Sequence, residues 1–447
     1  MERGTLSVLR RLFFWTVLLL IPVAFSMLAD RTLSFWGFPE ELPTQVSHPR
    51  GVREIRRNVE FTYEFATNDR GLRYRDLPLE KPKETYRVLV VGDSMTEGVG
   101  VAQDETFSAL LERRFLAKGP IEFINGGLGG TGVFEYGRLF LSWGVAYQVD
   151  ALLVAVFAND VWNADPGDRP ENLWLRREGD EFFGPIPERS FLKRLLHAVW
   201  PRIYTRLYQL NAASERRSLT VTSDLVGTIS DEARRRGIPE PQIDAWKARL
   251  PPDLVVAVNQ QRMEADILSY GLLIPSHWTD SLDIDTPAAK ARFTSMRAML
   301  DRIVEETARR GIEVAVVYLP DRLQYDAHSH VGNPTQLAGV RFRREWLAED
   351  STVQRELARW SRERGIAFLD LTSVFRAWAG DRTMLTYRID GHWTPAGHRV
   401  AAYAIGAWLQ DGGVFHWIPR THQKDPCFPM RCLSAVGGAE NEAVPLP

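Results

Sequence analysis

The chain has 447 residues, of which 45% are hydrophobic and 25% are charged, and its formal net charge at pH 7 is −2. These values fit an ordinary globular protein, with either one large domain carrying insertions or two domains. The near-neutral charge and the lack of a basic run argue against a protein that binds nucleic acid.

The N-terminus carries a targeting signal. Arg3, Arg10 and Arg11 precede an uncharged, apolar stretch over residues 12–29. As a helix this stretch would rise about 27 Å, enough to cross the hydrocarbon core of a lipid bilayer. The arginines predict that residues 1–11 stay in the cytoplasm and that the body lies outside, in the periplasm or the extracellular space. A cleaved signal peptide is the alternative, but no small-x-small cleavage site ends the stretch, which favours an uncleaved single-pass anchor.

Residues 30–85 are polar and contain prolines, and we interpret them as a linker and lead-in with a pair of short extended pieces. From residue 86 onward, apolar runs alternate with helical patterns. The predicted strands are 87–91, 121–124, 151–157, 312–318 and 366–371, and the predicted helices are 105–118, 133–147, 287–310, 346–364 and a final one that ends near 409. This alternation predicts a three-layer α/β domain over residues 86–410, with a five-stranded parallel sheet and right-handed crossovers.

The alternation breaks over residues 163–285, where charged and aromatic segments are separated by prolines. We predict that this stretch is a helical insertion that covers part of the C-terminal edge of the sheet. Its segment 192–210 is amphipathic and could also rest on a membrane surface. Pro201 interrupts that segment, which favours packing onto the body of the protein.

The C-terminal tail, residues 411–447, is interrupted by prolines and is predicted to be irregular. It also holds the two cysteines, Cys427 and Cys432. They would close a small disulfide loop in an extracytoplasmic body or remain free thiols, and the sequence favours neither. Two thiols alone cannot form a zinc site.

Polar residues follow the ends of the predicted strands. Ser94 follows the first strand, a glycine-rich loop with Gly130 follows the second, and Asn159 follows the third, while Asp390 and His392 lie in a late loop. Parallel strands present their C-terminal ends along one edge of a sheet, so these groups can converge. Acyl transfer needs a serine with an imidazole base, a carboxylate that orients the imidazole, and donors for the oxyanion. The backbone N–H groups of Ser94 and Gly130 and the Asn159 amide can supply those donors.

Four short blocks resemble, in sequence and in order, those of the SGNH (GDSL) hydrolase superfamily: Gly92-Asp93-Ser94, Asn125-x-Gly127-x-x-Gly130, Asn159-Asp160 and Asp390-x-His392. The resemblance covers roughly residues 86–160 and 287–410 and implies a flavodoxin-like sheet. It implies that Ser94 is the nucleophile, that His392 is the base and that Asp390 orients the base. It also implies an oxyanion hole formed by Ser94, Gly130 and Asn159.

Two blocks depart from the superfamily pattern. The third usually reads Gly-x-Asn-Asp, but here it begins with Phe157 and Ala158, and the last usually reads Asp-x-x-His, but here one residue separates Asp390 from His392. The Asp-x-His-Trp form resembles that of alginate-type polysaccharide O-acetyltransferases. In an extended segment, residues two apart project to the same side, which keeps an Asp–His hydrogen bond feasible.

Structural roles are the alternatives for the neighbouring residues. Asp390, His392 and His398 could bind a metal, but no further cluster lies at ligand spacing, and we predict no metal site. His398 is expected to pack or to face solvent at the start of the last helix. Trp393 either lines the site or wedges the loop onto the body.

We predict a membrane-anchored, extracytoplasmic serine esterase that removes acyl groups, above all acetyl groups, through a Ser94-bound intermediate without metal or organic cofactor. An O-acetyltransferase that modifies a cell-envelope or exported polysaccharide is the alternative, since a sugar hydroxyl can replace water as acceptor. A catalytically silent carbohydrate-binding protein is a third hypothesis. The expected partners are an acylated small molecule or glycan and the lipid bilayer, through residues 12–29. The sequence does not identify protein partners.

Overall fold

The computed structural model describes residues 14–15, 21–33, 47–116, 119–164, 176–178, 181–183, 196, 199–200, 202–203, 207, 224–260, 262–263, 266–330, 341–379 and 384–416. The strands are β1 (Arg53–Arg57), β2 (Thr62–Ala66), β3 (Tyr86–Gly92), β4 (Ile121–Gly127), β5 (Ala151–Phe157), β6 (Arg176–Glu178), β7 (Glu181–Phe183), β8 (Glu313–Leu319) and β9 (Ala367–Asp370). The α-helices are α2 (Ser94–Glu97), α3 (Phe107–Leu116), α4 (Val133–Leu139), α5 (Asp160–Asn163), α8 (Leu225–Arg235), α9 (Glu240–Lys247), α10 (Pro252–Asn259), α11 (Asp266–Leu273), α12 (His277–Leu282), α13 (Pro287–Arg310), α15 (Thr352–Arg364), α16 (Thr372–Ala379) and α17 (Pro395–Asp411). Shorter 3₁₀ or π turns are η2 (Gln103–Glu105), η3 (Phe140–Gly144), η5 (Arg322–Gln324), η6 (Ala327–His330) and η7 (Arg344–Leu347).

The described residues form a five-stranded parallel sheet in the order β4-β3-β5-β8-β9. These strands coincide with the five predicted runs, which confirms the predicted α/β fold with a parallel sheet. Strands β3 and β5 are buried along their whole length, as expected for parallel strands covered on both faces. Val91 of β3 lies opposite Gly126 of β4 and Val154 of β5, and the C-terminal ends of the three strands therefore meet at one edge.

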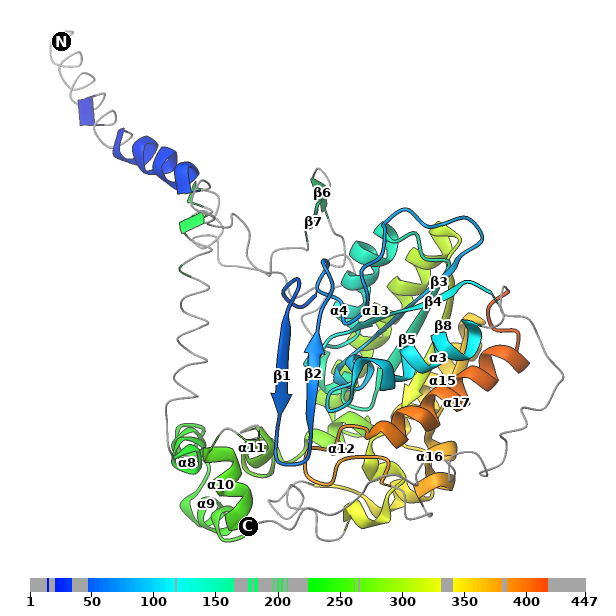
Figure 1. Ribbon diagram of the computed structural model, residues 1–447. Helices are drawn as coiled ribbons and strands as arrows, with labels where there is room; N and C mark the ends of the chain where they lie inside the picture. The colour runs from blue at the N-terminus through cyan, green and yellow to red at the C-terminus, as the bar shows by residue number, and fades with distance from the viewer. Residues whose placement is uncertain are drawn as a thin grey trace, which may run out of the picture.

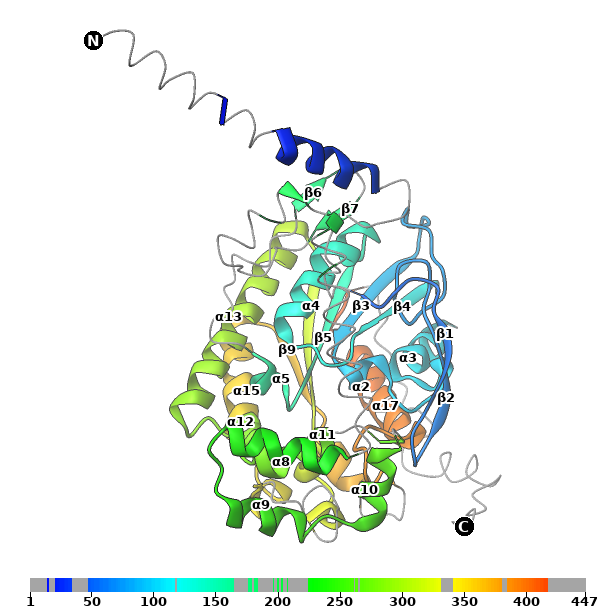
Figure 2. The ribbon, with the colours of Figure 1, turned by 90° about the vertical axis from the view of Figure 1, so that its left-hand side faces the viewer.

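Helices cover both faces of this sheet (Figures 1 and 2). Helix α3 packs against α17 in one layer, and α13 packs against α4 and α5 in the other. The main apolar core extends from the sheet into both helix layers. This arrangement is the predicted three-layer architecture.

Helix α15 begins later than predicted, at Thr352 instead of residue 346. The Ser351 hydroxyl accepts the Gln354 backbone N–H at 3.3 Å, and the Gln354 side chain accepts the Ser351 N–H at 2.8 Å. This reciprocal capping box fixes where the helix starts. The preceding residues form the separate turn η7.

The lead-in forms an antiparallel hairpin from the two predicted extended pieces, β1 and β2. Its turn is closed by a hydrogen bond of 2.9 Å from the Asn58 N–H to the Phe61 carbonyl. Figure 1 shows that this turn points toward helices α10 and α11.

The predicted helical insertion is only partly helical among the described residues. Strands β6 and β7 pair antiparallel where helices were expected. Further along, helices α8 to α11 (residues 225–273), which we call the helical lobe, enclose an apolar core of their own. Val59 of the hairpin turn and Ile389 of the late loop pack against this core. The lobe therefore contacts two segments that are far apart in the sequence.

Several predictions fall wholly or partly outside the described residues. The predicted anchor, residues 12–29, is described only at 14–15 and from 21 onward. Within the described ranges, no helix is both long and apolar enough to span a bilayer. Most of segment 192–210 lies outside those ranges, as do Cys427 and Cys432.

Gly127 generates a test of the packing between β4 and α2. A Cβ atom at this position would lie 2.0 Å from the Glu97 backbone nitrogen. Because a backbone shift there would disturb the sheet, we expect Gly127→Ala to destabilise the protein by about 3 kcal/mol or more. Gly311→Ala is the control, since its Cβ meets no atom within 4 Å and only its left-handed backbone would cost about 1–2 kcal/mol. Urea unfolding measures both free energies, and equal losses would contradict the close contact.

Candidate active site

Ser94 is the first residue of helix α2 and lies just beyond the end of β3. The Asp93 carboxylate accepts a hydrogen bond of 2.9 Å from the Met95 N–H and caps this helix. The helix is short, and its C-terminal residue Glu97 is buried. The turn thus holds Ser94 at the edge where the strand ends meet.

A chain of hydrogen bonds joins Ser94, His392 and Asp390. The Nε2 atom of His392 lies 2.8 Å from the Ser94 Oγ. The opposite ring nitrogen, Nδ1, is hydrogen-bonded to Oδ1 of Asp390, which also accepts the His392 backbone N–H at 3.2 Å. Serine, imidazole and carboxylate therefore stand in the order that nucleophilic acyl transfer needs.

The Asp390–His392 segment is a turn, which corrects the extended conformation assumed from the sequence. Gly391 has a φ angle of 90°, in the left-handed region that favours glycine. The Gly391 N–H donates to the Tyr387 carbonyl at 3.1 Å. This turn, instead of a strand, brings the carboxylate and the imidazole together across a single intervening residue.

Asp390 is held from two sides. The Asn58 Nδ2 donates to Asp390 Oδ2 at 3.0 Å, and Glu60 accepts the backbone N–H groups of Ile389 and Asp390 at 2.9 and 2.7 Å. Burial opposes ionisation of Asp390, but the charge of His392 and the hydrogen bonds from its ring and backbone outweigh it and keep the Asp390 pKa below its usual value. Asp390 is thus a carboxylate, able to stabilise a protonated His392.

The glycine-rich loop after β4 is fastened to the nucleophile helix by Glu97. Its Oε2 accepts the Gly129 N–H at 2.7 Å and lies 3.0 Å from the His48 Nε2. Burial would raise the pKa of Glu97, but the hydrogen bond and charge of His48 and the Gly129 N–H hold it below its usual value. Within the described residues, the N–H groups of Ser94 and Gly130 have no recorded acceptor. Both can therefore bind a ligand oxygen.

Asn159 lies two residues after the end of β5, the neighbour of β3. Its side-chain oxygen is buried without a hydrogen-bond partner, and it makes no capping bond to α5. Asp160 closes the loop by accepting the Tyr136 hydroxyl at 2.7 Å and the Phe157 N–H at 2.9 Å. Phe157 and Ala158, which stand where the superfamily pattern has Gly-x before Asn159, are buried in the core and fit the loop.

Two buried carboxyl groups lie behind the nucleophile turn. Burial raises the pKa of Asp93 to about 6, and one of its oxygens, Oδ2, has no hydrogen-bond partner. Burial and the charge of Asp93 raise the pKa of Asp160 well above the usual range. The fold thus favours the protonated form of both groups.

The neighbouring aromatic and histidine side chains are structural. Trp393 is fully buried and stacks on Phe375 with ring centroids 4.8 Å apart, which places it as the wedge of the late loop. His398 accepts the Phe107 N–H through Nδ1, and burial lowers its pKa to about 3, which keeps the ring neutral. Across the described ranges, no group of three or more His, Cys, Asp or Glu side chains could hold a metal ion.

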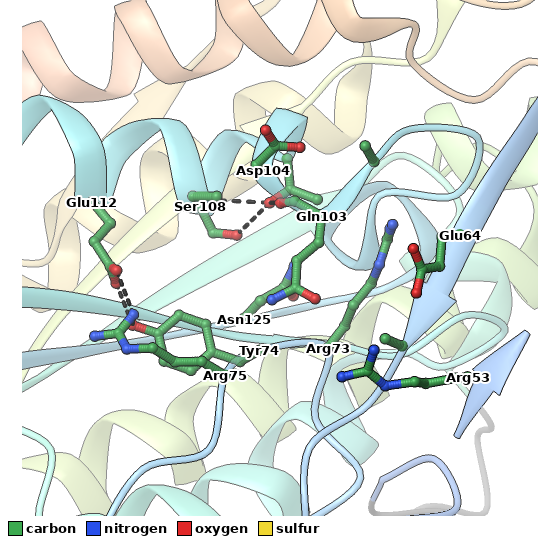
Figure 3. A pocket seen from close by; sticks show the side chains of 14 residues that line it. Arg53, Glu64, Arg73, Tyr74, Arg75, Gln103, Asp104, Ser108, Glu112 and Asn125 are labelled. Carbon is green, nitrogen blue, oxygen red and sulfur yellow. Dashed lines mark hydrogen bonds and ion pairs between the residues drawn. The ribbon is translucent and has the colours of Figure 1, made fainter. Parts of the chain in front are cut away.

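A polar cavity of about 460 Å³ lies between the hairpin and α3 (Figure 3). Its lining includes Arg73, whose guanidinium donates to the Glu97 carbonyl at 2.9 Å, and Asn125 of β4. The cavity also holds the ion pair between Arg75 and Glu112. Arg73 therefore supports the C-terminal end of the nucleophile helix from this side.

Sequence reasoning missed Asn58, Glu60 and Glu97. The first two belong to residues 30–85, which the sequence predicts only as a linker and lead-in, and no local pattern marks them. Glu97 had a usable signal, because an acidic residue inside the apolar turn after Ser94 needs a partner once it is buried.

Comparison with known families supports the resemblance seen in the sequence. Residues 278–424 match the family described as SGNH hydrolase-like domain, acetyltransferase AlgX. Over this segment the chain is similar to the SGNH hydrolase-like domain of these acetyltransferases. The matched segment contains Asp390 and His392, whereas Ser94 lies before it and joins it through the fold. The match and the hydrogen-bonded triad identify an SGNH-type enzyme that acts on esters.

Solved structures similar to this chain include GDSL proteins and esterases. A catalytic mutant of Axe2, an acetylxylan esterase from Geobacillus stearothermophilus, is 13% identical with a TM-score of 0.35, over 75% of this chain and 97% of that one. A lipolytic G-D-S-L family protein from Veillonella parvula DSM 2008 is 12% identical with a TM-score of 0.31, over 72% and 96%. TesA is 10% identical with a TM-score of 0.33, over 74% and 99%. These scores are too low to bear on function, and no curated protein matches the chain.

The raised pKa of Asp93 generates a prediction about stability and pH. A carboxyl with a folded pKa near 6 and an unfolded pKa near 3.8 favours folding when protonated, so its contribution falls as pH rises from about 4 to about 7. Asp93→Asn keeps the cap acceptor and removes the ionisation. Its stability relative to the wild type should therefore rise by up to about 3 kcal/mol over that window.

Urea unfolding from pH 4 to pH 8 measures this difference. Asp104→Asn is the control, because the Asp104 side chain is 77% exposed and its exchange should give a pH-independent difference. If the difference in unfolding free energy between Asp93→Asn and the wild type is also independent of pH, the fold does not raise the Asp93 pKa.

Proposed function

We propose that this protein is a serine-dependent O-acetyltransferase that carries an acetyl group on Ser94 and passes it to a glycan hydroxyl. The observation that carries this proposal is the hydrogen-bonded series from Ser94 Oγ through His392 to Asp390. The acetyltransferase family match over the segment that supplies the last two residues supports it.

In the first half-reaction, His392 Nε2 takes the proton of Ser94 Oγ as this oxygen attacks the acetyl carbonyl of the donor. The C–O bond to the donor alcohol then breaks, and His392 returns the proton to that alcohol. Asp390 stabilises the imidazolium that forms in between. The product is acetyl-Ser94 and a free alcohol.

In the second half-reaction, His392 takes the proton of an acceptor hydroxyl as this oxygen attacks the acetyl-Ser94 carbonyl. The bond from the carbonyl carbon to Ser94 Oγ then breaks, and His392 returns the proton to Ser94 Oγ. Each attack places negative charge on the carbonyl oxygen. We assign its stabilisation to the N–H groups of Ser94 and Gly130 and to the Asn159 amide. Such donors are typically worth about 100- to 1,000-fold in rate each.

An esterase is the second candidate, because water can replace the glycan in the second half-reaction. The His392 side chain is 23% exposed, so bulk water can approach the base. The sequence alone favoured this outcome, whereas the family match now favours transfer. A catalytically silent binding protein has less support, since the short Asp390–His392 spacing does not break the hydrogen bond between them.

We propose further that the acceptor is an extracytoplasmic glycan and that the chain is anchored in the membrane by residues 12–29. The apolar stretch and its leading arginines support this location. The Asp390-x-His392-Trp393 block, which resembles that of alginate-type polysaccharide O-acetyltransferases, and the acetyltransferase family match support the glycan.

Removal of the nucleophile is the first test. Ser94→Ala should lower the turnover of p-nitrophenyl acetate by the purified full chain at least about 10⁴-fold, because no acyl-enzyme can form. His392→Ala and Asp390→Asn should lose activity to a similar order, since the Asp–His bond is fully engaged. Circular dichroism verifies folding. Retained turnover in folded Ser94→Ala would rule out Ser94 as the nucleophile.

The identity of the acceptor is the second test. With p-nitrophenyl acetate as donor, unacetylated oligosaccharides should accelerate p-nitrophenol release, and mass spectrometry should detect acetylated oligosaccharide. Ser94→Ala is the control for non-enzymatic acetylation. Release that is indifferent to every oligosaccharide, with acetate as the only product, would identify an esterase.

A further inference from the structure

We propose that Asn58, in the turn of the β1–β2 hairpin, is a positioning residue that orients the Asp390 carboxylate toward His392. The inference rests on the proposed acyl-transfer function of the triad. It adds to that site a segment of the chain that lies outside the four family blocks. Asn58 and Asp390 are separated by 332 positions in the sequence.

The two oxygens of the Asp390 carboxylate have separate partners. Oδ1 receives the ring and backbone N–H groups of His392, and Oδ2 receives the Asn58 amide at 3.0 Å. The Asp390 side chain is 9% exposed, so water cannot replace a lost donor without cost. The Asn58 bond therefore decides which oxygen faces the imidazole.

The orientation of the Asn58 amide is itself fixed. Its oxygen accepts the backbone N–H groups of Glu60 at 2.8 Å and Phe61 at 3.0 Å. A flipped amide would place its NH₂ group against these two donors, which excludes the flip. The NH₂ group must therefore point away from the turn, toward Asp390.

The same turn also holds the backbone of the late loop. Glu60 accepts the N–H groups of Ile389 and Asp390 through its carboxylate. The turn is fixed in place by the helical lobe, because the Val59 N–H donates to the Arg262 carbonyl at 3.0 Å and Val59 packs on the lobe core. Side chain and backbone of Asp390 thus share one rigid support.

The short Asp-x-His spacing explains why this support is needed. With Gly391 at a left-handed φ, the segment is a turn whose local bonds end at Tyr387 and leave Oδ2 of Asp390 without a partner from its own loop. Arg322 holds the other side of the loop by donating to the carbonyls of Tyr387 and Arg388. The hairpin turn supplies that oxygen with a side-chain donor, the Asn58 amide.

Asn58→Asp separates positioning from a purely structural role. Aspartate keeps the size of the side chain and the oxygen that accepts the two turn N–H groups, but it places an acceptor against Asp390 Oδ2. We expect kcat for p-nitrophenyl acetate to fall about 10- to 100-fold with KM unchanged, because the carboxylate and imidazole are displaced from their reactive alignment. The acidic limb of the pH–rate profile should also move to higher pH, since added negative charge favours protonated His392. The other charged or titratable groups near the pair are Glu60, Asp93, Arg322 and Tyr387, and they stay unchanged.

Asn68→Asp is the matched control. Asn68 is also a buried turn asparagine, whose oxygen accepts the N–H groups of Arg70 and Leu72 and whose NH₂ donates to the Arg75 carbonyl. Asn68→Asp removes the same kind of side-chain donor, but at a position whose partner is the Arg75 carbonyl and not Asp390. Asn68→Asp should leave the pH–rate profile unchanged even if it alters thermal stability. A purely structural effect of Asn58→Asp would likewise leave the profile unchanged.

A readout that needs no turnover keeps this inference distinct from the proposed function. In the Ser94→Ala background, proton NMR of the His392 Nδ1–H should show a downfield resonance that shifts or disappears on Asn58→Asp and persists on Asn68→Asp. The positioning role is overturned if folded Asn58→Asp leaves the His392 resonance, kcat and the pH–rate profile all unchanged. Absent turnover in the wild type, with the resonance change intact, would instead overturn the acyl-transfer proposal alone.

Discussion

The contact between Gly127 and helix α2 is the constraint on which the site depends. Strand β4 approaches the backbone of Glu97 so closely that no side chain fits between them. This contact sets the height of the nucleophile turn above the sheet. It also places the Glu97 carboxylate beside the Gly129 N–H, which attaches the glycine-rich loop to the same turn. The turn that carries Ser94 and the glycine-rich loop are thus fixed to each other by one piece of backbone packing.

The buried carboxyl groups around Ser94 differ in pKa because they differ in hydrogen-bond partners. Glu97 and Asp390 are each surrounded by N–H donors and a histidine, and these partners outweigh the cost of burial. Asp93 has one oxygen without a partner, and its burial therefore favours the protonated form. The site thus combines two carboxyl groups whose pKa values are lowered with a helix-capping carboxyl, Asp93, whose pKa is raised to about 6. This division follows from hydrogen bonding, since all three side chains are buried.

The sheet and the triad could both be predicted from the sequence because short local patterns indicate them. Apolar runs of β-branched residues end at Gly92 and Phe157, and each is followed by a short polar block. The capping box at Ser351 is also local, but the helical pattern of the sequence extends past it to residue 346. The turn at Gly391 is local too, but an extended conformation was assumed for this segment from the sequence. The roles of Asn58 and Glu60 could not be predicted, because their partners lie more than 300 positions away and are joined only by the folded chain. Long-range polar contacts of this kind have no periodicity to detect.

The distance in sequence between Ser94 and His392 has a consequence for biosynthesis. The bond between them spans 298 positions, and the bond that holds Asp390 spans 332. A nascent or truncated chain that ends before the last strand can form the nucleophile turn, yet it lacks the base that activates the serine. Contacts of such separation form late and slowly, after local helices and hairpins. The hydrogen bond between Ser94 and His392 therefore forms only after both segments of the chain have folded together.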